Sequence, residues 1–425
     1  MSPPIIALLI LLLCVVLFLT ERVPNAVTAC LGCVLMVLCR VCTFEEAFSG
    51  FSSSIVLLLA GSMVVGSAMF HTGAAQLIGA RVLALSGGNG RLFLLIGGSI
   101  AGILAMFLAN NAVIAAFLPL IDSICGTSPE LDRRDLTLPV ACCTMFGGAC
   151  TLVGCTPQLT ANGMLREMTG LELGMWDLTG PGLCLTVVCV AYLTLFGFRR
   201  GRKIWGGRRG EEGQPGTAAP AEHPVRDRRK IIIVFLIMAA MIVFYIGAWL
   251  STAMTALCAA ILCVLSGCCD VKRLASQINW ECLVFLAGCL GLANGLTASG
   301  AGSMMAERLF ALLGASVSPM WVFALLVFAT LLISQIITNS TAIIITLPVA
   351  LSLCSAYGFS HVAFCLGIVF GGSLACSTPL AAAQITVTQS AGYRFSDYFR
   401  YTWPLAVLSY IGILIFVPLF FPLVL

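Results

Sequence analysis

Two short polar segments interrupt long apolar stretches of this 425-residue chain. Asn110 and Asn111 lie in the first segment, and Asn339, Ser340 and Thr341 lie in the second. Polar side chains at membrane depth are costly, so they mark either a binding site or a helix–helix contact. A proline follows the first asparagine of each segment nine residues later. The two asparagines are 229 positions apart, and so are the two prolines. This repetition favours a binding site over packing.

A Gly-rich run that ends in Thr-Pro follows each polar segment. The first run carries Gly147, Gly148 and Thr151 and ends at Thr156 and Pro157, and the second carries Gly371, Gly372 and Ser373 and ends at Thr378 and Pro379. Gly and Pro interrupt helices and leave backbone groups without intrahelical partners. Helix N-termini at such breaks suit an anion. The carbonyls and hydroxyls beside them suit a dehydrated Na⁺.

Composition identifies the class of protein. Hydrophobic residues make up 60% of the chain, charged residues 9%, and the mean hydropathy is +1.06. A soluble chain of this length could not hide so much apolar surface, so we expect an all-α polytopic membrane protein. The 21 Cys and 3 His show neither metal-site spacing nor a catalytic set, which argues against an enzyme. No Asp, Glu, Lys or Arg falls in the middle of an apolar span, which argues against a transporter built on buried carboxylates.

The elements that would position the two polar segments recur in two halves. The expected N-terminal repeat is 1–198, with a re-entrant hairpin at 91–125, a broken helix at 136–168 and an interfacial helix at 73–86. The expected C-terminal repeat is 231–425, with a hairpin at 320–355 and a broken helix at 361–390. A basic linker at 199–230 joins them. Each half is expected to cross the membrane five times, about ten helices in all, so the halves form an inverted-topology repeat.

The distribution of basic residues predicts the orientation. If the linker is cytoplasmic, 19 of the 22 Lys and Arg residues lie on the cytoplasmic side. The sequence therefore predicts a multi-pass protein of the cell membrane, the inner membrane of a bacterium, with both termini outside.

These features resemble the divalent anion:Na⁺ symporters, the solute carrier family 13-like group of the ion transporter superfamily. The resemblance rests on the two Asn tips, the two Thr-Pro breaks, the early segment 20–24 and the segment 392–395. It implies a homodimer and a rigid scaffold beside a moving elevator domain. It also implies that Asn110, Asn111, Asn339 and Ser340 contact the substrate. The family has Ser-Asn-Thr at both tips, whereas this chain has Ala109-Asn110-Asn111 and Thr338-Asn339-Ser340.

The predicted function is Na⁺-coupled symport of a small divalent or trivalent anion, such as a dicarboxylate, citrate or sulfate, with the lipid bilayer as surroundings and no nucleic-acid partner. The expected substrate-binding residues are Asn110, Asn111, Asn339, Ser340, Thr341, Thr156, Pro157, Thr378 and Pro379. The expected Na⁺-binding residues are Asn110, Gly147, Gly148, Thr151, Asn339, Gly371, Gly372 and Ser373. One alternative is an efflux permease for arsenite or a similar oxyanion, with Cys150, Cys155 and Cys376 as thiol ligands. The other is a passive anion channel.

Overall fold

The computed structural model describes residues 2–424 except 21, 75–76, 78–80, 82–84, 128–129, 207–227, 270–277, 314–317 and 380–381. Its described part contains helices and one isolated bridge between Phe359 and Val424, but no strand. Six described helices are long and apolar enough to cross a membrane, and seven shorter apolar helices accompany them. The predicted class, an all-α polytopic membrane protein, is therefore confirmed. Most of the expected interfacial helix at 73–86 and of the linker lies outside the described residues.

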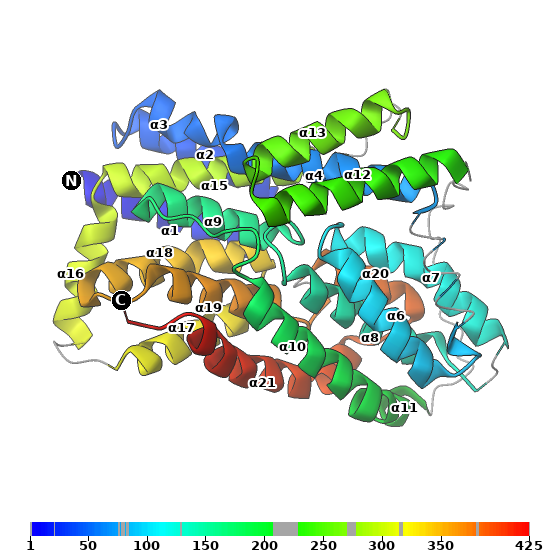
Figure 1. Ribbon diagram of the computed structural model, residues 1–425. Helices are drawn as coiled ribbons and strands as arrows, with labels where there is room; N and C mark the ends of the chain where they lie inside the picture. The colour runs from blue at the N-terminus through cyan, green and yellow to red at the C-terminus, as the bar shows by residue number, and fades with distance from the viewer. Residues whose placement is uncertain are drawn as a thin grey trace.

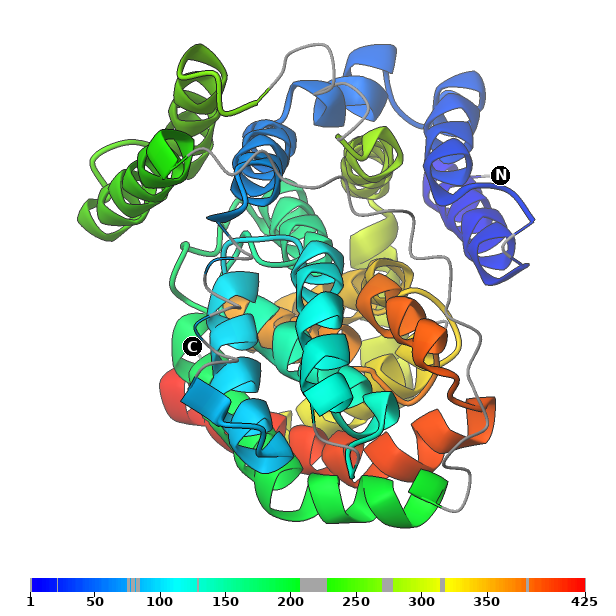
Figure 2. The ribbon, with the colours of Figure 1, turned by 90° about the vertical axis from the view of Figure 1, so that its right-hand side faces the viewer.

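The helices form two layers, which Figures 1 and 2 show one above the other. The first layer contains α1 (Pro3–Thr20), α2 (Asn25–Leu38), α3 (Phe44–Phe48), α4 (Ser54–His71), α12 (Arg228–Gly247), α13 (Thr252–Leu265) and α15 (Trp280–Ala298). Helix α16 (Ala301–Leu313) follows α15 and leads toward the second layer.

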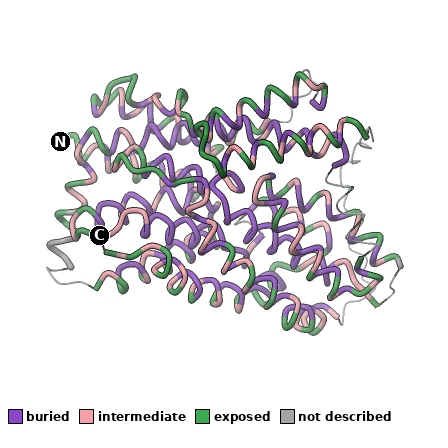
Figure 3. The backbone as a smooth tube through the Cα atoms, viewed as in Figure 1, coloured by how far each residue is buried: buried purple, intermediate pink, exposed green. Residues whose placement is uncertain are grey.

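The second layer takes its helices from both halves of the chain. From the first half come α6 (Gly90–Ala105), α7 (Asn110–Thr127), α8 (Arg133–Gly148), α9 (Thr156–Thr169), α10 (Thr179–Tyr192) and α11 (Phe198–Trp205). From the second half come α17 (Pro319–Ser334), α18 (Asn339–Tyr357), α19 (His361–Ser373), α20 (Ala383–Val387) and α21 (Phe395–Phe420). Helices α8, α18 and α19 are buried along most of their length, so they form the core of this layer (Figure 3).

The helix breaks fall at the polar segments. Helix α6 ends at Ala105 and α7 begins at Asn110, while α17 ends at Ser334 and α18 begins at Asn339. The two Gly-rich runs separate α8 from α9 and α19 from α20. The two breaks differ, because α9 has 14 residues whereas α20 has only 5 and passes into a short 3₁₀ turn at Thr388–Ala391. Thr156 opens α9, but Thr378 precedes the start of α20 by several residues.

Two pairs of helices in the first layer pack reciprocally. An ideal Cβ on Gly61 of α4 would lie 2.8 Å from the Ala256 carbonyl carbon of α13. An ideal Cβ on Gly288 of α15 would likewise lie 2.8 Å from Ala29 Cβ of α2. Gly61 and Gly288, like Ala29 and Ala256, are 227 positions apart. Exchanging the two halves thus exchanges one contact for the other, which is the pattern expected of halves related by a two-fold axis.

Candidate functional site

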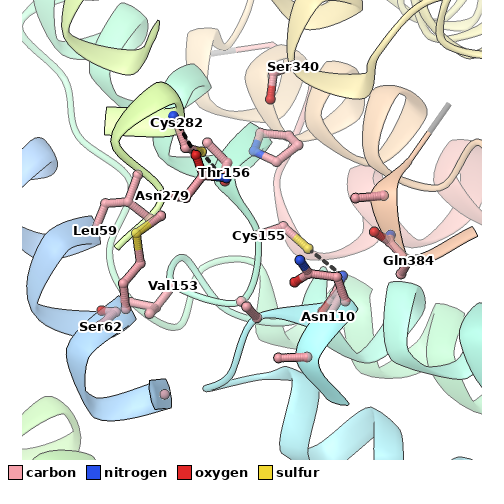
Figure 4. A pocket seen from close by; sticks show the side chains of 18 of the residues that line it. Leu59, Ser62, Asn110, Val153, Cys155, Thr156, Asn279, Cys282, Ser340 and Gln384 are labelled. Carbon is pink, nitrogen blue, oxygen red and sulfur yellow. Dashed lines mark hydrogen bonds between the residues drawn. The ribbon is translucent and has the colours of Figure 1, made fainter. Parts of the chain in front are cut away.

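A cavity of about 770 Å³ lies between the two layers, and both contribute to its wall. Figure 4 shows Leu59 and Ser62 of α4 on the opposite side from Asn110 and Gln384. The first layer also supplies Asn279 and Cys282 at the start of α15. Residues far apart in sequence therefore meet around one space large enough for a small organic ligand.

The N-termini of four long helices border this cavity. Its lining includes the first residues of α7 (Asn110), α9 (Thr156) and α18 (Asn339), together with Asn279 and Glu281, which flank the first residue of α15. The first turn of a helix has N–H groups without intrahelical partners and carries a partial positive charge. Four such ends around one cavity favour a ligand with anionic oxygens.

The first tip holds a buried amide oxygen in an unusual position. Asn110 Nδ2 lies 2.9 Å from Cys155 Sγ, whereas its Oδ1 is buried and accepts no hydrogen bond. A Cβ on Gly148 would overlap Asn110 Oδ1, so only glycine allows the amide to pack there. Gln158 Nε2 donates to the Gly148 carbonyl oxygen at 3.3 Å, and Gln158 Oε1 is also buried without a partner.

The second tip has a similar arrangement built from different side chains. Asn339 Nδ2 donates to the Ser373 carbonyl oxygen at 3.3 Å. The Ser334 hydroxyl lies 2.9 Å from Asn339 Oδ1 and 2.7 Å from the Gly372 carbonyl oxygen, and it donates to one of them at a time. Ser373 Oγ is buried and has no hydrogen-bond partner. Each tip therefore presents several buried oxygens, at least one of them without a donor.

Such oxygen clusters fit a small hard cation. Na⁺ and similar ions bind through carbonyl, amide and hydroxyl oxygens, and a buried oxygen without a donor is costly unless something else satisfies it. Asn110 Oδ1 at the first tip and Ser373 Oγ at the second meet this description.

Equivalent hydrogen bonds tie each Gly-rich run to its hairpin. The Thr151 hydroxyl donates to the carbonyl of Met106, the residue that caps the C-terminus of α6. The Thr378 hydroxyl donates at 2.6 Å to the carbonyl of Gln335, which caps α17. These bonds occupy exposed helix carbonyls and fix the tips against the breaks.

The structure brings some of the predicted site residues into the wall of the cavity and leaves others outside it. The predicted residues that line the cavity are Asn110, Asn111, Asn339, Ser340, Thr156, Pro157 and Ser373. Those outside the lining are Thr341, Thr378, Pro379, Gly147, Gly148, Thr151, Gly371 and Gly372.

Two of the predicted Na⁺-binding glycines have a packing role. Gly147 lets α8 approach Gly102 of α6, and Gly371 lets α19 approach Val327 of α17, because a side chain would collide with or crowd the facing backbone. Thr341 Oγ1 lies 2.8 Å from Thr338 Oγ1, so these two hydroxyls satisfy each other.

Both layers contribute wall residues that the sequence did not single out. The first layer supplies Asn25, Ser62, His71, Asn279, Glu281 and Cys282, and the second layer supplies Gln384. Glu281 lies in the first turn of α15. Apart from the cysteines, His71 and Glu281 are the ionisable side chains in the described lining. The described lining contains neither Lys nor Arg.

The three cysteines considered as thiol ligands do not meet. Cys155 lines the cavity, but Cys150 Sγ lies 3.2 Å from Thr186 Oγ1, and Cys376 lies beside Cys142. Across the described residues, no group of three or more His, Cys, Asp and Glu is arranged to hold a metal ion. All 21 cysteines are free thiols.

Comparison with known proteins gives one family match. A family model described as "Citrate transporter" matches residues 15–327, well over half of the chain. A sodium-dependent dicarboxylate transporter of Staphylococcus saprophyticus is 23% identical over 370 residues, which is 79% of this chain and 70% of that protein. An uncharacterized transporter of a Synechocystis strain is 28% identical over 190 residues, which is 45% of this chain. That match spans only 31% of the Synechocystis protein.

Solved structures share the fold at low sequence identity. The YdaH transporter of Alcanivorax borkumensis superposes with a TM-score of 0.59 at 14% identity, covering 88% of this chain and 86% of its own. MtrF of Neisseria gonorrhoeae, whose title describes a class of antimetabolite efflux pumps, gives a TM-score of 0.55 at 12% identity, covering 92% and 85%. At these identities the likeness concerns the fold alone.

Proposed function

Because this chain belongs to the citrate transporter family, we propose that it carries a small divalent or trivalent anion across the membrane by Na⁺-coupled symport. The family and the relatives are transporters and not enzymes. The chain is accordingly a multi-pass membrane transporter. The nature of its substrate and of its coupling ion is the content of the proposal.

The convergence of four helix N-termini on one cavity is the observation that carries the anion assignment. The described lining offers neutral donors, among them the amides of Asn110 and Asn111 and the hydroxyl of Ser340, and no Lys or Arg. Dipoles and neutral donors would hold a polyanion and still allow its release. A citrate, dicarboxylate or sulfate ion suits such a site.

Co-bound Na⁺ would supply the missing positive charge. The oxygen clusters at Asn110 and at Asn339 lie at the two tips that also border the cavity. A cation at either tip would attract the anion, so each would bind more tightly when the other is present, and this mutual dependence is what couples their transport. The names of the Staphylococcus relatives point to the same coupling ion.

An elevator motion accounts for the position of the cavity between two layers. The first layer would be the scaffold, and the second layer would carry the tips and the bound ions past it. The reciprocal packing of Gly61 on Ala256 and Gly288 on Ala29 supports the inverted repeat that such a motion requires. We further propose a homodimer in the cell membrane, with both termini outside and the linker cytoplasmic.

Transport by the purified full chain in liposomes tests the proposal. Citrate, succinate and sulfate are offered outside, with an inward Na⁺ gradient, with choline in place of Na⁺, and with a pH gradient alone. We expect one of these anions to accumulate above its external concentration only with the Na⁺ gradient. Accumulation driven by the pH gradient alone would exclude Na⁺ coupling. Equilibration without accumulation in every condition would indicate a channel, and selective flux of arsenite would indicate the oxyanion permease.

A further inference from the structure

A second hollow, of about 470 Å³, lies on the outer face of the second layer, away from the cavity. It is a groove between the end of α10, the start of α11 and helix α21, which lie side by side in Figure 1. Its wall contains Tyr192, Phe196, Arg199, Arg200, Lys203 and Trp403. Three cations and three aromatic rings thus share one groove.

The spacing of the cations places them on one side of the helix that lines the groove. Residues Leu193–Gly197 form a π-helical turn that joins α10 to α11. Phe196 lies three and four residues before Arg199 and Arg200 and seven before Lys203, the spacing of a single helix face. Gly197 lies close to α21, because a Cβ there would be 2.9 Å from the Tyr401 hydroxyl. The π-helical turn is therefore closely packed against α21 beside the groove.

The cations in the groove have different roles. The Arg200 guanidinium lies 5.6 Å from the centroid of the Trp403 ring and donates to the Arg400 carbonyl oxygen at 2.8 and 3.1 Å, so it holds α11 against α21. Arg199 and Lys203 are exposed, and neither forms an ion pair with a residue in the described part of the chain. The described lining of the groove includes no Asp or Glu. The groove therefore has positive charge available for a ligand.

The surroundings of the groove are apolar and face outward. Leu195 is 61% exposed, Phe196 66% and Phe399 59%. Helices α10–α11 and α21 belong to the long apolar helices, so these side chains face lipid once the protein is in a membrane. Basic residues at the boundary of an apolar helix pair, beside aromatic rings, match a lipid with an anionic headgroup.

We propose that this groove binds an anionic phospholipid. The headgroup phosphate lies between Arg199 and Lys203, and an acyl chain runs along Phe196 and Trp403. The groove favours a lipid over a free phosphate, because its apolar wall increases the affinity only for a ligand that has an acyl chain. This lipid site is separate from the cavity proposed for the transported anion, so the lipid proposal does not depend on the proposed substrate.

Native mass spectrometry of the detergent-solubilised full chain tests this. Phosphatidylglycerol and phosphatidylcholine with the same acyl chains are titrated separately, and glycerol 1-phosphate is added as a competitor. The test variant is Arg199→Gln with Lys203→Gln, which leaves the structural Arg200 in place. The matched control is Arg228→Gln with Lys230→Gln, which removes two charges from the start of α12, outside the groove.

We expect the parent protein and the control to bind phosphatidylglycerol at least tenfold more tightly than phosphatidylcholine, and the test variant to lose most of this preference. Phe196→Ala keeps every charge and should lower the affinity for both lipids. Equal binding of the two lipids by the parent, an unchanged preference in the test variant, or an equal loss in test and control would each overturn the proposal. Complete displacement by glycerol 1-phosphate would also overturn it in favour of a free-phosphate site.

Discussion

The Thr156 hydroxyl lies 3.2 Å from the Cys282 thiol, and the two side chains belong to different layers. Thr156 opens α9 in the second layer, and Cys282 lies in the first turn of α15 in the first layer (Figure 4). Both line the cavity. If the second layer slides past the first, this contact must break in every transport cycle.

A disulfide across this contact should stop transport. Thr156→Cys places a second thiol next to Cys282, so mild oxidation should join the layers and reduce uptake to background, and a reductant should restore it. The matched control is Thr186→Cys, because the native Thr186 hydroxyl lies an equal 3.2 Å from the Cys150 thiol and both residues belong to the second layer. Its disulfide should leave transport nearly unchanged. Full uptake by cross-linked Thr156→Cys protein would rule out relative motion of the layers at this point.

Removal of either tip amide should weaken substrate binding. A hydrogen bond to an anionic oxygen is worth roughly 1.5–3 kcal/mol, so Asn110→Ala and Asn339→Ala should each raise the apparent KM on the order of tenfold to a hundredfold or abolish uptake. Expression and monodispersity should be kept. Asn294→Ala serves as the control, because that amide donates to Ser49 Oγ at 2.5 Å, away from the cavity. If both tip variants transport like the parent protein, the polar segments serve helix packing and do not bind the substrate.

Gly148→Ala should disable the first tip through crowding alone. The added methyl group would collide with Asn110 Oδ1 and displace the amide. Overpacking of this kind costs typically about 1–3 kcal/mol, and we expect uptake to fall at least tenfold. Gly126→Ala is the control, because a Cβ there meets nothing within 4 Å. The uptake rates of the two variants are measured at saturating Na⁺. Equal rates would show that transport does not depend on the position of the Asn110 amide.

Ser373→Ala should act on the coupling ion. It removes a buried oxygen without a partner at the second tip. Loss of a ligand contact worth about 1 kcal/mol lowers affinity roughly fivefold. The Na⁺ concentration for half-maximal uptake should therefore rise by that factor. Ser352→Ala is closely matched, because its hydroxyl is also buried and unpartnered but lies outside the cavity lining. An unchanged Na⁺ dependence in Ser373→Ala would remove this oxygen from the ion site.

The proposed orientation can be measured with reporters. Figure 1 shows both termini at the same end of the molecule, while α11 and α12, which border the linker, extend toward the other end. A reporter active only in the cytoplasm should give a signal when inserted within 207–227 and none when fused after Leu425. The same signal from both positions would contradict an odd number of crossings in the C-terminal half.

The sequence by itself determined the class of protein and the places where its helices break. Hydrocarbon has no water to satisfy backbone groups, so spans must be long apolar helices, and every polar or Gly-Pro interruption is conspicuous. For that reason the starts of α7 and α18, at Asn110 and Asn339, coincide with the polar segments read from the chain. The constant offset between the two halves is also the offset between Gly61 and Gly288, whose contact partners only the structure shows.

Only the tertiary structure decided which residues share the cavity. Ser62, Asn279 and Cys282 belong to spans whose sequences look like ordinary membrane helices, and they became wall residues because the first layer packs against the tips. The sequence predicts Gly147 and Gly371 as ligand glycines, and only the fold shows the neighbouring helices that give each of them a packing role. A glycine beside a facing helix and a glycine beside a ligand are identical in a sequence, because what distinguishes them is the neighbour that distant parts of the chain bring to it.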